Sequence, residues 1–317
     1  MGCVMFWIPP AEKVASNGTV LMELADLVTE QLRPELDDLD LRPTSELVRL
    51  MAADQKEALD ALEAASASVA AAVEAVHSQL EAGGRLIYVG AGTAGRLGLL
   101  DAAECPPTFN TDRVIGVMAG GATAFNVPQE AVEDDAGAGA ADMDNLAVTA
   151  TDAVVGLAAS GRTPYTIGAV VRARELGAVT IGVSCNPEAL LSRHVDYPIE
   201  VLVGPEVIAG STRLKAGTAQ KTVLNIISTV AMVRLGKTFG NLMVDLRANN
   251  EKLRDRARRI VFQATGADMK QVDDALRASD GEVKVAILML LGGLSVIEAR
   301  QRLESHRGVV RKALEDR

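Results

Sequence analysis

The chain has 317 residues, a formal net charge of −10 at pH 7 and a pI near 5.0. This length suffices for one large α/β domain with a smaller appendage. The acidic balance argues against nucleic acid and anionic membranes as partners. No apolar run reaches the roughly 18 residues of a membrane-spanning helix. The three cysteines form no C-x-x-C pair, which favours a reducing cytoplasm without structural disulfides.

Residues 1–28 are predicted to form an N-terminal extension, to which we assign no function. Two helices are expected within residues 44–82, where Thr44 or Ser45 can cap the first and Ala-rich apolar spacing continues to Leu80. Beyond Gly266, four short amphipathic helices are expected. The predicted organisation is therefore an extension (1–28), a main domain with N-terminal helices (29–250) and a small helical domain (251–317).

Short apolar runs alternate with helical patterns through the middle of the chain. The predicted strands are Leu86–Val89, Val114–Met118, Ala153–Ala158, Val179–Val183 and Tyr197–Val203. Four helices are expected between and after these strands. The first ends at Pro106-Pro107, the second begins at Pro128, the third lies around Ile167–Leu176, and the fourth runs from Glu206 to Lys237. This alternation predicts a doubly wound parallel sheet with helices on both faces.

A glycine turn follows the first predicted strand, in the sequence Gly90-Ala-Gly92-Thr93-Ala-Gly95. A strand, a glycine turn and a helix N-terminus together favour anion binding. The G-x-G-x-x-G spacing is also typical of a dinucleotide-binding fold, but such a fold needs an acidic residue at the end of the next strand. Asp112 precedes that strand instead. A sugar phosphate is therefore the better ligand class.

Two further segments place polar donors after predicted strands. Ser160, Gly161 and Thr163 precede Pro164 at an expected helix start, which suits phosphate binding or simple capping. The segment from Gly204 to Lys221 concentrates hydroxyl and basic side chains, and it favours either an anion site or a solvated helix face. Its donors are Ser211, Thr212, Arg213, Lys215, Thr218 and Lys221.

General acid–base chemistry is expected to fall to carboxylates. His77, His194 and His306 lie outside the glycine loops and lack metal-ligand spacing, and Cys105 and Cys185 have no nearby histidine. Glu104 stands out because apolar and proline residues flank it and favour a desolvated carboxylate. The other candidates follow the second strand: Glu130, Glu133, Asp134 and Asp135.

Together these segments closely resemble the N-acetylmuramic acid 6-phosphate etherase family of the sugar-isomerase (SIS) domain superfamily. The motifs are GRLIYVGAGTAGRLG, DAAECPPTF, GLAASGRTPYTIGA, GVSCNP, GPEVIAGSTRLKAGTAQK and GKTFGNLMVDL. The resemblance begins near Thr29 and reaches the C-terminus. The chain departs from the family at Arg33, where the family has Asn. Ala158 replaces the first Ser of the wider superfamily's S-x-S-G-x-T loop, a change that the etherases share.

The resemblance implies a five-stranded parallel sheet, a C-terminal helical domain similar to ubiquitin-associated folds, and a homodimer with its active site near the subunit interface. It implies a lyase that cleaves the D-lactyl ether of N-acetylmuramate 6-phosphate without a metal or organic cofactor. Glu104 and Glu133 match the family's catalytic glutamates, with Glu104 as the acid and Glu133 as the base. The alternatives are a sugar-phosphate isomerase of the same fold and a phosphosugar-sensing regulator.

The residues predicted to bind the substrate and its phosphate come from four segments. They are Gly92, Thr93, Ser160, Gly161, Thr163, Ser184, Glu206, Ser211, Thr212 and Lys215. If one continuous helix runs from Thr93 to Glu104, it is about 17 Å long. Either this helix breaks early, or Glu104 acts in the partner subunit's site, and our hypothesis is the second.

Overall fold

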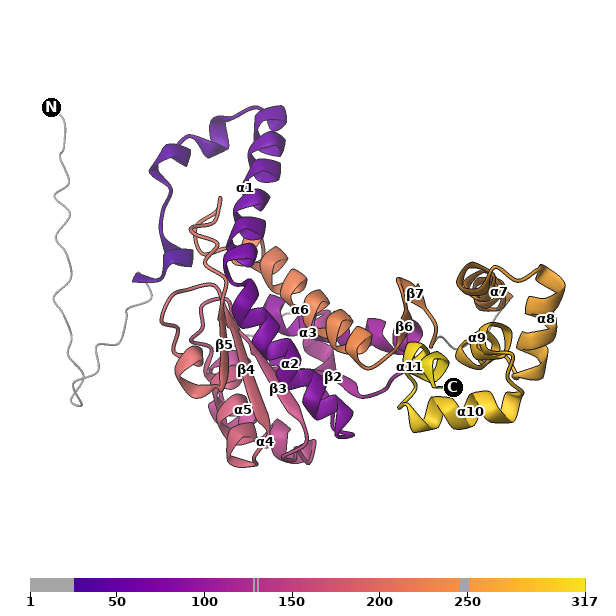
Figure 1. Cartoon of the computed structure of the whole chain (residues 1–317). Coiled ribbons are helices and arrows are strands. Elements are labelled where there is room, and N and C mark those ends of the chain that lie inside the picture. The colour runs from indigo at the N-terminus through magenta and orange to yellow at the C-terminus, as the bar shows by residue number, and fades with distance from the viewer. Residues whose placement is uncertain (1–25, 128, 130, 246–250, 317) are drawn as a thin grey trace, which may run out of the picture.

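A five-stranded parallel sheet forms the centre of the molecule (Figure 1). The computed structural model describes residues 26–127, 129, 131–245 and 251–316. The strands are β1 (Leu86–Gly90), β2 (Val114–Met118), β3 (Ala153–Leu157), β4 (Val179–Ser184) and β5 (Tyr197–Glu200). Their order is β2-β1-β3-β4-β5, and every neighbouring pair is parallel. The predicted five-stranded parallel sheet is confirmed.

Helices cover both faces of this sheet. One apolar core joins the sheet to α2 (Ser66–Glu81), α3 (Gly92–Phe109) and α6 (Lys215–Arg234). The opposite core joins it to α4 (Ala136–Asn145) and α5 (Pro164–Glu175). All residues of β1 and β3 are buried between these layers, which explains their continuous apolar sequence. The doubly wound arrangement is therefore confirmed.

The segment before the sheet contains the two helices expected there. α1 (Thr44–Ala64) and α2 are separated at Ala65. Shorter 3-10 turns complete the described main domain: η2 (Val28–Glu30), η3 (Pro34–Leu36), η4 (Leu39–Leu41), η5 (Gly121–Phe125), η6 (Val132–Asp134) and η7 (Leu191–His194). Of the predicted N-terminal extension, residues 1–25 lie outside the described part of the chain.

Three helix boundaries differ from the sequence prediction. α3 does not end at Pro106-Pro107 but includes both prolines and continues to Phe109. The two prolines lack a backbone N–H and so leave helix hydrogen bonds unmade, and the burial of Cys105 and Phe109 in the core compensates for this loss. Asn110, at φ +50°, closes the last turn by donating its backbone N–H to the carbonyl of Pro106. α6 begins at Lys215 rather than Glu206, and α4 begins at Ala136. Pro128, the expected start of that helix, lies outside the described residues.

A second lobe holds the C-terminal helices (Figure 1). They are α7 (Glu251–Thr265), α8 (Met269–Ala278), α9 (Val283–Gly292), α10 (Val296–Ser305) and α11 (Val310–Glu315). Reciprocal side-chain and backbone hydrogen bonds cap α8 at Asp268 and α10 at Ser295. The four helices expected beyond Gly266 are confirmed, and α7 precedes them.

The core of this lobe starts before residue 251. It takes in Phe239, Leu242 and Val244 from the hairpin formed by β6 (Thr238–Phe239) and β7 (Leu242–Met243). The hairpin and the C-terminal helices therefore pack as one unit. Within the described residues, no helix combines the length and apolar character needed to cross a bilayer.

Candidate functional site

The strand order places a topological switch point between β1 and β3. From β1 the chain proceeds to β2 on one side, whereas from β3 it proceeds to β4 on the other. The loops that leave β1 and β3 therefore diverge and open a crevice at the carboxyl edge of the sheet, where ligands of such sheets bind. The turn of Ala91, Gly92 and Thr93, where β1 passes into the first residues of α3, is called the β1 loop below, and Ser160 stands in the loop after β3.

The glycines after β1 serve two different purposes. Gly92 has φ +54°, and a β-carbon there would meet no atom within 4 Å, so its backbone faces open space. A β-carbon on Gly95 would lie 2.6 Å from the carbonyl oxygen of Gly90, because α3 packs tightly on the sheet. A β-carbon on Gly217 would lie 3.6 Å from Thr93 Cγ2. The β1 loop therefore lies beside the first turn of α6.

The loop after β3 packs onto the end of β4. Gly161 has φ +68°, and a β-carbon there would lie 2.4 Å from the Ala189 side chain and 3.2 Å from Ser184 Cβ. The backbone N–H of Arg162 donates to Ser160 Oγ at 3.2 Å. Ser184 is fully buried, and in the described part of the chain its Oγ has no hydrogen-bond partner. The structure thus brings Ser160, Gly161 and Ser184 together, as the sequence predicts.

Glu206 caps α6 from the preceding loop. Its buried carboxylate accepts hydrogen bonds from the backbone N–H groups of Lys215 at 3.1 Å and Ala216 at 2.9 Å. Burial raises the pKa of Glu206, and the two backbone hydrogen bonds and the charge of Lys215 oppose this rise. Glu206 therefore holds the first turn of α6 in place beside the β1 loop.

The ammonium group of Lys215 is buried and paired. Its Nζ lies 2.5 Å from Glu57 Oε2 and 3.3 Å from Asp54 Oδ1, both on α1. Arg33 NH1 shares the Asp54 carboxylate at 2.5 Å. Lys215 thus links α6 to α1, and Arg33, where the resembled family has Asn, joins the same cluster. Sequence reasoning missed both acidic partners, which lie more than 150 residues away.

Thr29 joins the segment that holds Ser211 and Thr212 to the end of β4. Asn186 Nδ2 donates to Thr29 Oγ1 at 3.0 Å and to the carbonyl of Ala159 at 3.1 Å. The backbone N–H of Gly210 donates to the carbonyl of Thr29 at 3.0 Å. Sequence reasoning assigned no role to Thr29 or Asn186, although Asn186 lies in the quoted GVSCNP motif.

Glu133 is exposed on the 3-10 turn η6. Val132 anchors this turn on the apolar core beneath α4 and α5. The turn packs against α5, the helix that begins directly after Thr163. Its neighbour Asp135 caps α4 by accepting from the backbone N–H of Ala138 at 2.9 Å. Glu133 thus differs from Asp135 in having its carboxylate available to a ligand. Glu130, another carboxylate considered from the sequence, lies outside the described residues.

Glu104 is exposed near the end of α3 and is not desolvated in the single chain, contrary to the sequence prediction. Its flanking residues Ala103, Pro106 and Pro107 are exposed as well, since this helix face turns away from the sheet. α3 is unbroken from Gly92 to Phe109, so about 17 Å of helix separates Thr93 from Glu104. The early break, the alternative to action in the partner's site, is absent, and the structure does not bring Glu104 to the β1 loop of its own chain.

The cysteines at the site are structural. Burial raises the pKa of Cys105 to about 12 and that of Cys185 to about 12, which keeps both thiols protonated. In the described part of the chain, no three His, Cys, Asp or Glu side chains gather in a metal-binding arrangement. The available acid–base groups near the crevice are therefore carboxylates.

The parallel sheet and the hydroxyl-bearing loop at its switch point belong to an SIS domain, as the family match shows. Residues 122–229 match the SIS domain family, and residues 68–174 match the family described as glucokinase regulatory protein N-terminal SIS domain. The chain belongs to the N-acetylmuramic acid 6-phosphate etherase family. It is 60% identical to the Rubrobacter xylanophilus protein of that name, over 92% of this chain and 97% of the relative.

A second relative supports the same membership. The N-acetylmuramic acid 6-phosphate etherase of Streptomyces avermitilis is 55% identical over 92% of this chain and 94% of its own length. Among solved structures, a phosphoheptose isomerase from Francisella tularensis is 19% identical, with a TM-score of 0.44 over 60% of this chain and 96% of that chain.

Proposed function

We propose that this chain is a carbon–oxygen lyase that releases D-lactate from N-acetylmuramate 6-phosphate and leaves N-acetylglucosamine 6-phosphate. The observation that carries the proposal is the 60% identity to an etherase over nearly the full length of both proteins. The crevice between the β1 and β3 loops supports it, since hydroxyl groups and a helix N-terminus meet there.

The reaction requires one base and one acid. In the ring-opened sugar, the C2–H bond is activated by the neighbouring aldehyde. Glu133 removes this proton, and Glu104 protonates the lactate oxygen as its bond to C3 breaks. Water then adds to the unsaturated aldehyde, with its hydroxyl at C3 and a proton at C2. Two carboxyl groups thus suffice, and we propose no metal or organic cofactor.

The phosphate is proposed to bind at the β3 loop. Ser160, Gly161 and Thr163 lead into α5, whose free N–H groups and positive dipole end face this loop. Ser184 supports this assignment because its buried Oγ has no hydrogen-bond partner among the described residues. Gly92 and Thr93 are proposed to contact the sugar from the β1 loop. Ser211 and Thr212 are proposed to line the opposite wall, and the buried Glu206 and Lys215 to hold the first turn of α6 behind it.

We propose a homodimer in which Glu104 acts in the site of the partner subunit. The unbroken α3 separates Glu104 from its own β1 loop. Exposed apolar side chains support an association surface: Leu100 on α3 is 43% exposed, and Leu59 on α1 is 55% exposed. A two-fold interface can bring a helix end of one chain beside the loops of the other.

Two alternative functions would differ from the proposed lyase in what they release. A sugar-phosphate isomerase also abstracts a C2 proton but releases no lactate, and a phosphosugar-sensing regulator binds without turnover. The relatives of 50–60% identity are named etherases, and neither alternative is favoured. We place the protein in the cytoplasm, because Cys105 and Cys185 are free thiols.

The deciding experiment incubates the purified chain with N-acetylmuramate 6-phosphate in ¹⁸O-labelled water. D-lactate should appear, and the label should enter the sugar at O3, because the C3–O bond breaks and water returns to C3. N-acetylmuramate without phosphate is the matched control and should react poorly. Absence of lactate, or label in lactate instead of the sugar, would contradict the proposal.

A further inference from the structure

A cleft of about 870 Å³ lies where the main domain meets the C-terminal lobe. One wall comes from the end of α2 and the end of α6, and the other comes from residues 305–312. The walls touch at Gly236, where a β-carbon would lie 2.8 Å from the Val309 side chain, and Arg307 pairs with Glu81 at 2.7 Å. The cleft is separate from the crevice at the carboxyl edge of the sheet.

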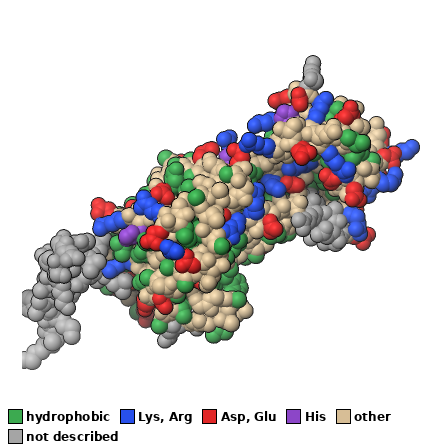
Figure 2. All heavy atoms as spheres, turned by 90° about the horizontal axis from the view of Figure 1, so that it is seen from below, with side chains coloured by type: hydrophobic (Ala, Val, Ile, Leu, Met, Phe, Trp, Pro, Cys, Tyr) green, Lys and Arg blue, Asp and Glu red, His purple; other side chains and the backbone are tan. Residues whose placement is uncertain are grey.

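Basic side chains dominate this cleft. Six of them line it, against only two acidic side chains, Glu81 and Asp245. The six are Arg113, Arg234, Lys237, Lys284, Arg307 and Lys312. Figure 2 shows Lys and Arg side chains over the region where the two lobes meet. Such an excess is unusual in a chain of net charge −10, and it creates a local positive potential.

The charge is distributed unevenly between the two parts of the chain. Residues 251–317 contain 14 Lys and Arg against 11 Asp and Glu, whereas residues 1–250 contain 18 against 31. The C-terminal lobe is therefore basic and the remainder strongly acidic. The lobe supplies three of the six cations of the cleft, namely Lys284, Arg307 and Lys312.

Two partly buried lysines share a single carboxylate at the base of the cleft. Asp245 Oδ2 lies 2.7 Å from Lys237 Nζ and 3.0 Å from Lys284 Nζ. The side chains of Lys237 and Lys284 are only 18% and 12% exposed. Burial lowers the pKa of Lys284, and the neighbouring Lys237 adds to this effect. One positive charge in this partly buried group is thus left without a counterion.

Two further cations carry charge that no described carboxylate neutralises. Arg113 NH1 donates to the carbonyl oxygens of Leu80 at 2.6 Å and Gly84 at 3.3 Å, so backbone groups position its guanidinium. Lys312 is exposed on α11 and forms no ion pair with any described residue. Together with Lys237 and Lys284, they give the cleft several donors for one multiply charged anion.

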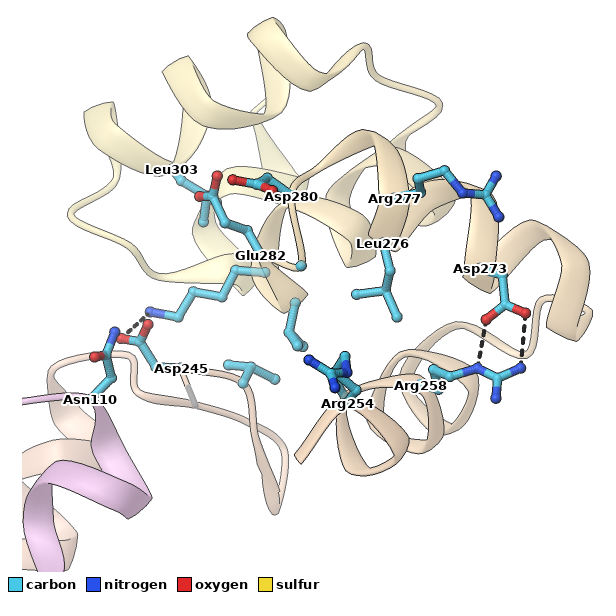
Figure 3. A pocket seen from close by; sticks show the side chains of 15 residues that line it. Asn110, Asp245, Arg254, Arg258, Asp273, Leu276, Arg277, Asp280, Glu282 and Leu303 are labelled. Carbon is cyan, nitrogen blue, oxygen red and sulfur yellow. Dashed lines mark hydrogen bonds and ion pairs between the residues drawn. The ribbon is translucent and has the colours of Figure 1, made fainter. Parts of the chain in front are cut away.

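A neighbouring cavity shows that the excess is local. It measures about 780 Å³ and shares Asp245 and Lys284 with the basic cleft, and Figure 3 shows the side chains that line it. Four basic and four acidic side chains line it, and Arg258 is already paired with Asp273 at 2.6 Å (Figure 3). Its charges balance, so it offers no comparable attraction for an anion.

We propose that the basic cleft binds a small phosphorylated molecule carrying at least two negative charges. Such an anion would neutralise the uncompensated ammonium group and accept hydrogen bonds from Lys312 and Arg113. Because both lobes line the cleft, a bound anion would also hold them together. The site stands apart from the proposed catalysis and is tested without it.

Inorganic pyrophosphate serves as the probe, and isothermal titration calorimetry measures its binding to the full chain. The Ser160→Ala/Thr163→Ala background removes the proposed phosphate loop as a competing site. Saturable binding of one anion per chain is expected. Lys312→Ala should weaken it about fivefold, and Lys284→Gln about tenfold, since each removes a charged donor.

The matched control is Lys270→Ala, which removes an exposed lysine of the same lobe away from the cleft. It should leave the affinity within about twofold of the background value. Lys312 is exposed, so its variant keeps the fold even if Lys284→Gln does not. The proposal is overturned by an absence of binding, by equal weakening in Lys270→Ala, or by affinity that survives Lys312→Ala unchanged.

Discussion

Asn186 and Thr29 lie 157 residues apart in sequence and share two hydrogen bonds. Asn186 Nδ2 donates to Thr29 Oγ1 at 3.0 Å, and the Thr29 backbone N–H donates to Asn186 Oδ1 at 3.3 Å. Both residues are fully buried. Since Thr29 also accepts from Gly210, this pair fixes the loop that carries Ser211 and Thr212.

Thr29→Val should therefore destabilise the fold and loosen the substrate loop. The change leaves the amide of Asn186 with an unsatisfied buried donor, which costs about 1–3 kcal/mol. Urea unfolding measures the loss, and an increased KM reports the loosened loop. Thr29→Ser keeps the hydroxyl and should cost clearly less. Equal losses in the two variants would show that the methyl group, not the hydrogen bond, matters.

Ser160→Ala/Thr163→Ala should raise KM by about tenfold or more and lower kcat as well, because phosphate binding also aligns the reacting carbons. Steady-state lactate release measures both constants. Ser45→Ala/Ser68→Ala, which removes two exposed hydroxyl groups from α1 and α2, is the matched control and should behave as the parent. Equal affinity of the parent for the phosphorylated and unphosphorylated sugars would contradict a phosphate role for this loop.

The strands were predictable because buried parallel strands are short, apolar and bounded by turn residues. β2 matches its predicted range, Val114–Met118. The course of α3 was not predictable, because local proline chemistry favours a stop, whereas burial of Cys105 and Phe109 extends the helix. Only tertiary packing reveals that contribution.

In the candidate site too, some features could be predicted from the sequence and others depend on tertiary contacts. The Ser160 loop and Ser184 follow adjacent strands, so their meeting is implied by strand order. The partners of Lys215 are different: Asp54 and Glu57 come from α1, and no local pattern links them to α6. The donor-rich segment from Gly204 to Lys221 therefore could not show that the charge of Lys215 is already neutralised by carboxylates.

Asp152 should contribute to stability at neutral pH and lose this contribution in acid. It is buried and paired with Arg85 at 2.7 Å. Burial alone would raise the pKa of Asp152, but hydrogen bonds from Arg85 and Thr149 outweigh it and lower the pKa. A carboxyl with a lowered folded-state pKa stabilises the fold above its unfolded pKa, near 4, and this stabilisation disappears as pH falls through the folded pKa.

Asp152→Asn should thus lower the free energy of unfolding at pH 7 by about 1–3 kcal/mol. Below about pH 4 its stability should fall less steeply than that of the parent. Urea unfolding at pH 7, 4 and 3 measures both effects. The exposed Asp60→Asn provides the control and should follow the parent. Parallel pH curves for the parent and Asp152→Asn would refute the argument.

Glu133→Gln should leave the fold intact and abolish exchange of the substrate C2 proton with deuterated water. Glu133 is exposed, so the amide replaces the carboxylate without a packing change. Nuclear magnetic resonance of the recovered substrate measures the exchange. Asp134→Asn, a change of equal charge on the same turn, should keep it. Exchange that persists in Glu133→Gln while lactate release stops would assign the acid role to Glu133 instead.

The last prediction concerns the subunit in which Glu104 acts. Glu104→Gln alone should be inactive because it lacks the acid, and Ser160→Ala/Thr163→Ala alone should show little activity at substrate concentrations well below its raised KM, where the mixing experiment is run. Mixed under conditions of subunit exchange, they form dimers in which one site combines an intact loop with the partner's intact Glu104. Random mixing in equal amounts gives half mixed dimers with one repaired site each, so activity should recover to about a quarter of the parent value.

Action of Glu104 within its own chain predicts the opposite result. Each chain would then carry one defect of the same site, and both sites of a mixed dimer would stay inactive. Native mass spectrometry establishes that mixed dimers are present, and lactate release measures the recovery. The control mixes Glu104→Gln with the active variant Lys270→Ala. Lactate release in this mixture shows that the conditions of subunit exchange do not themselves inactivate the protein. Mixed dimers without recovered activity would refute the shared site.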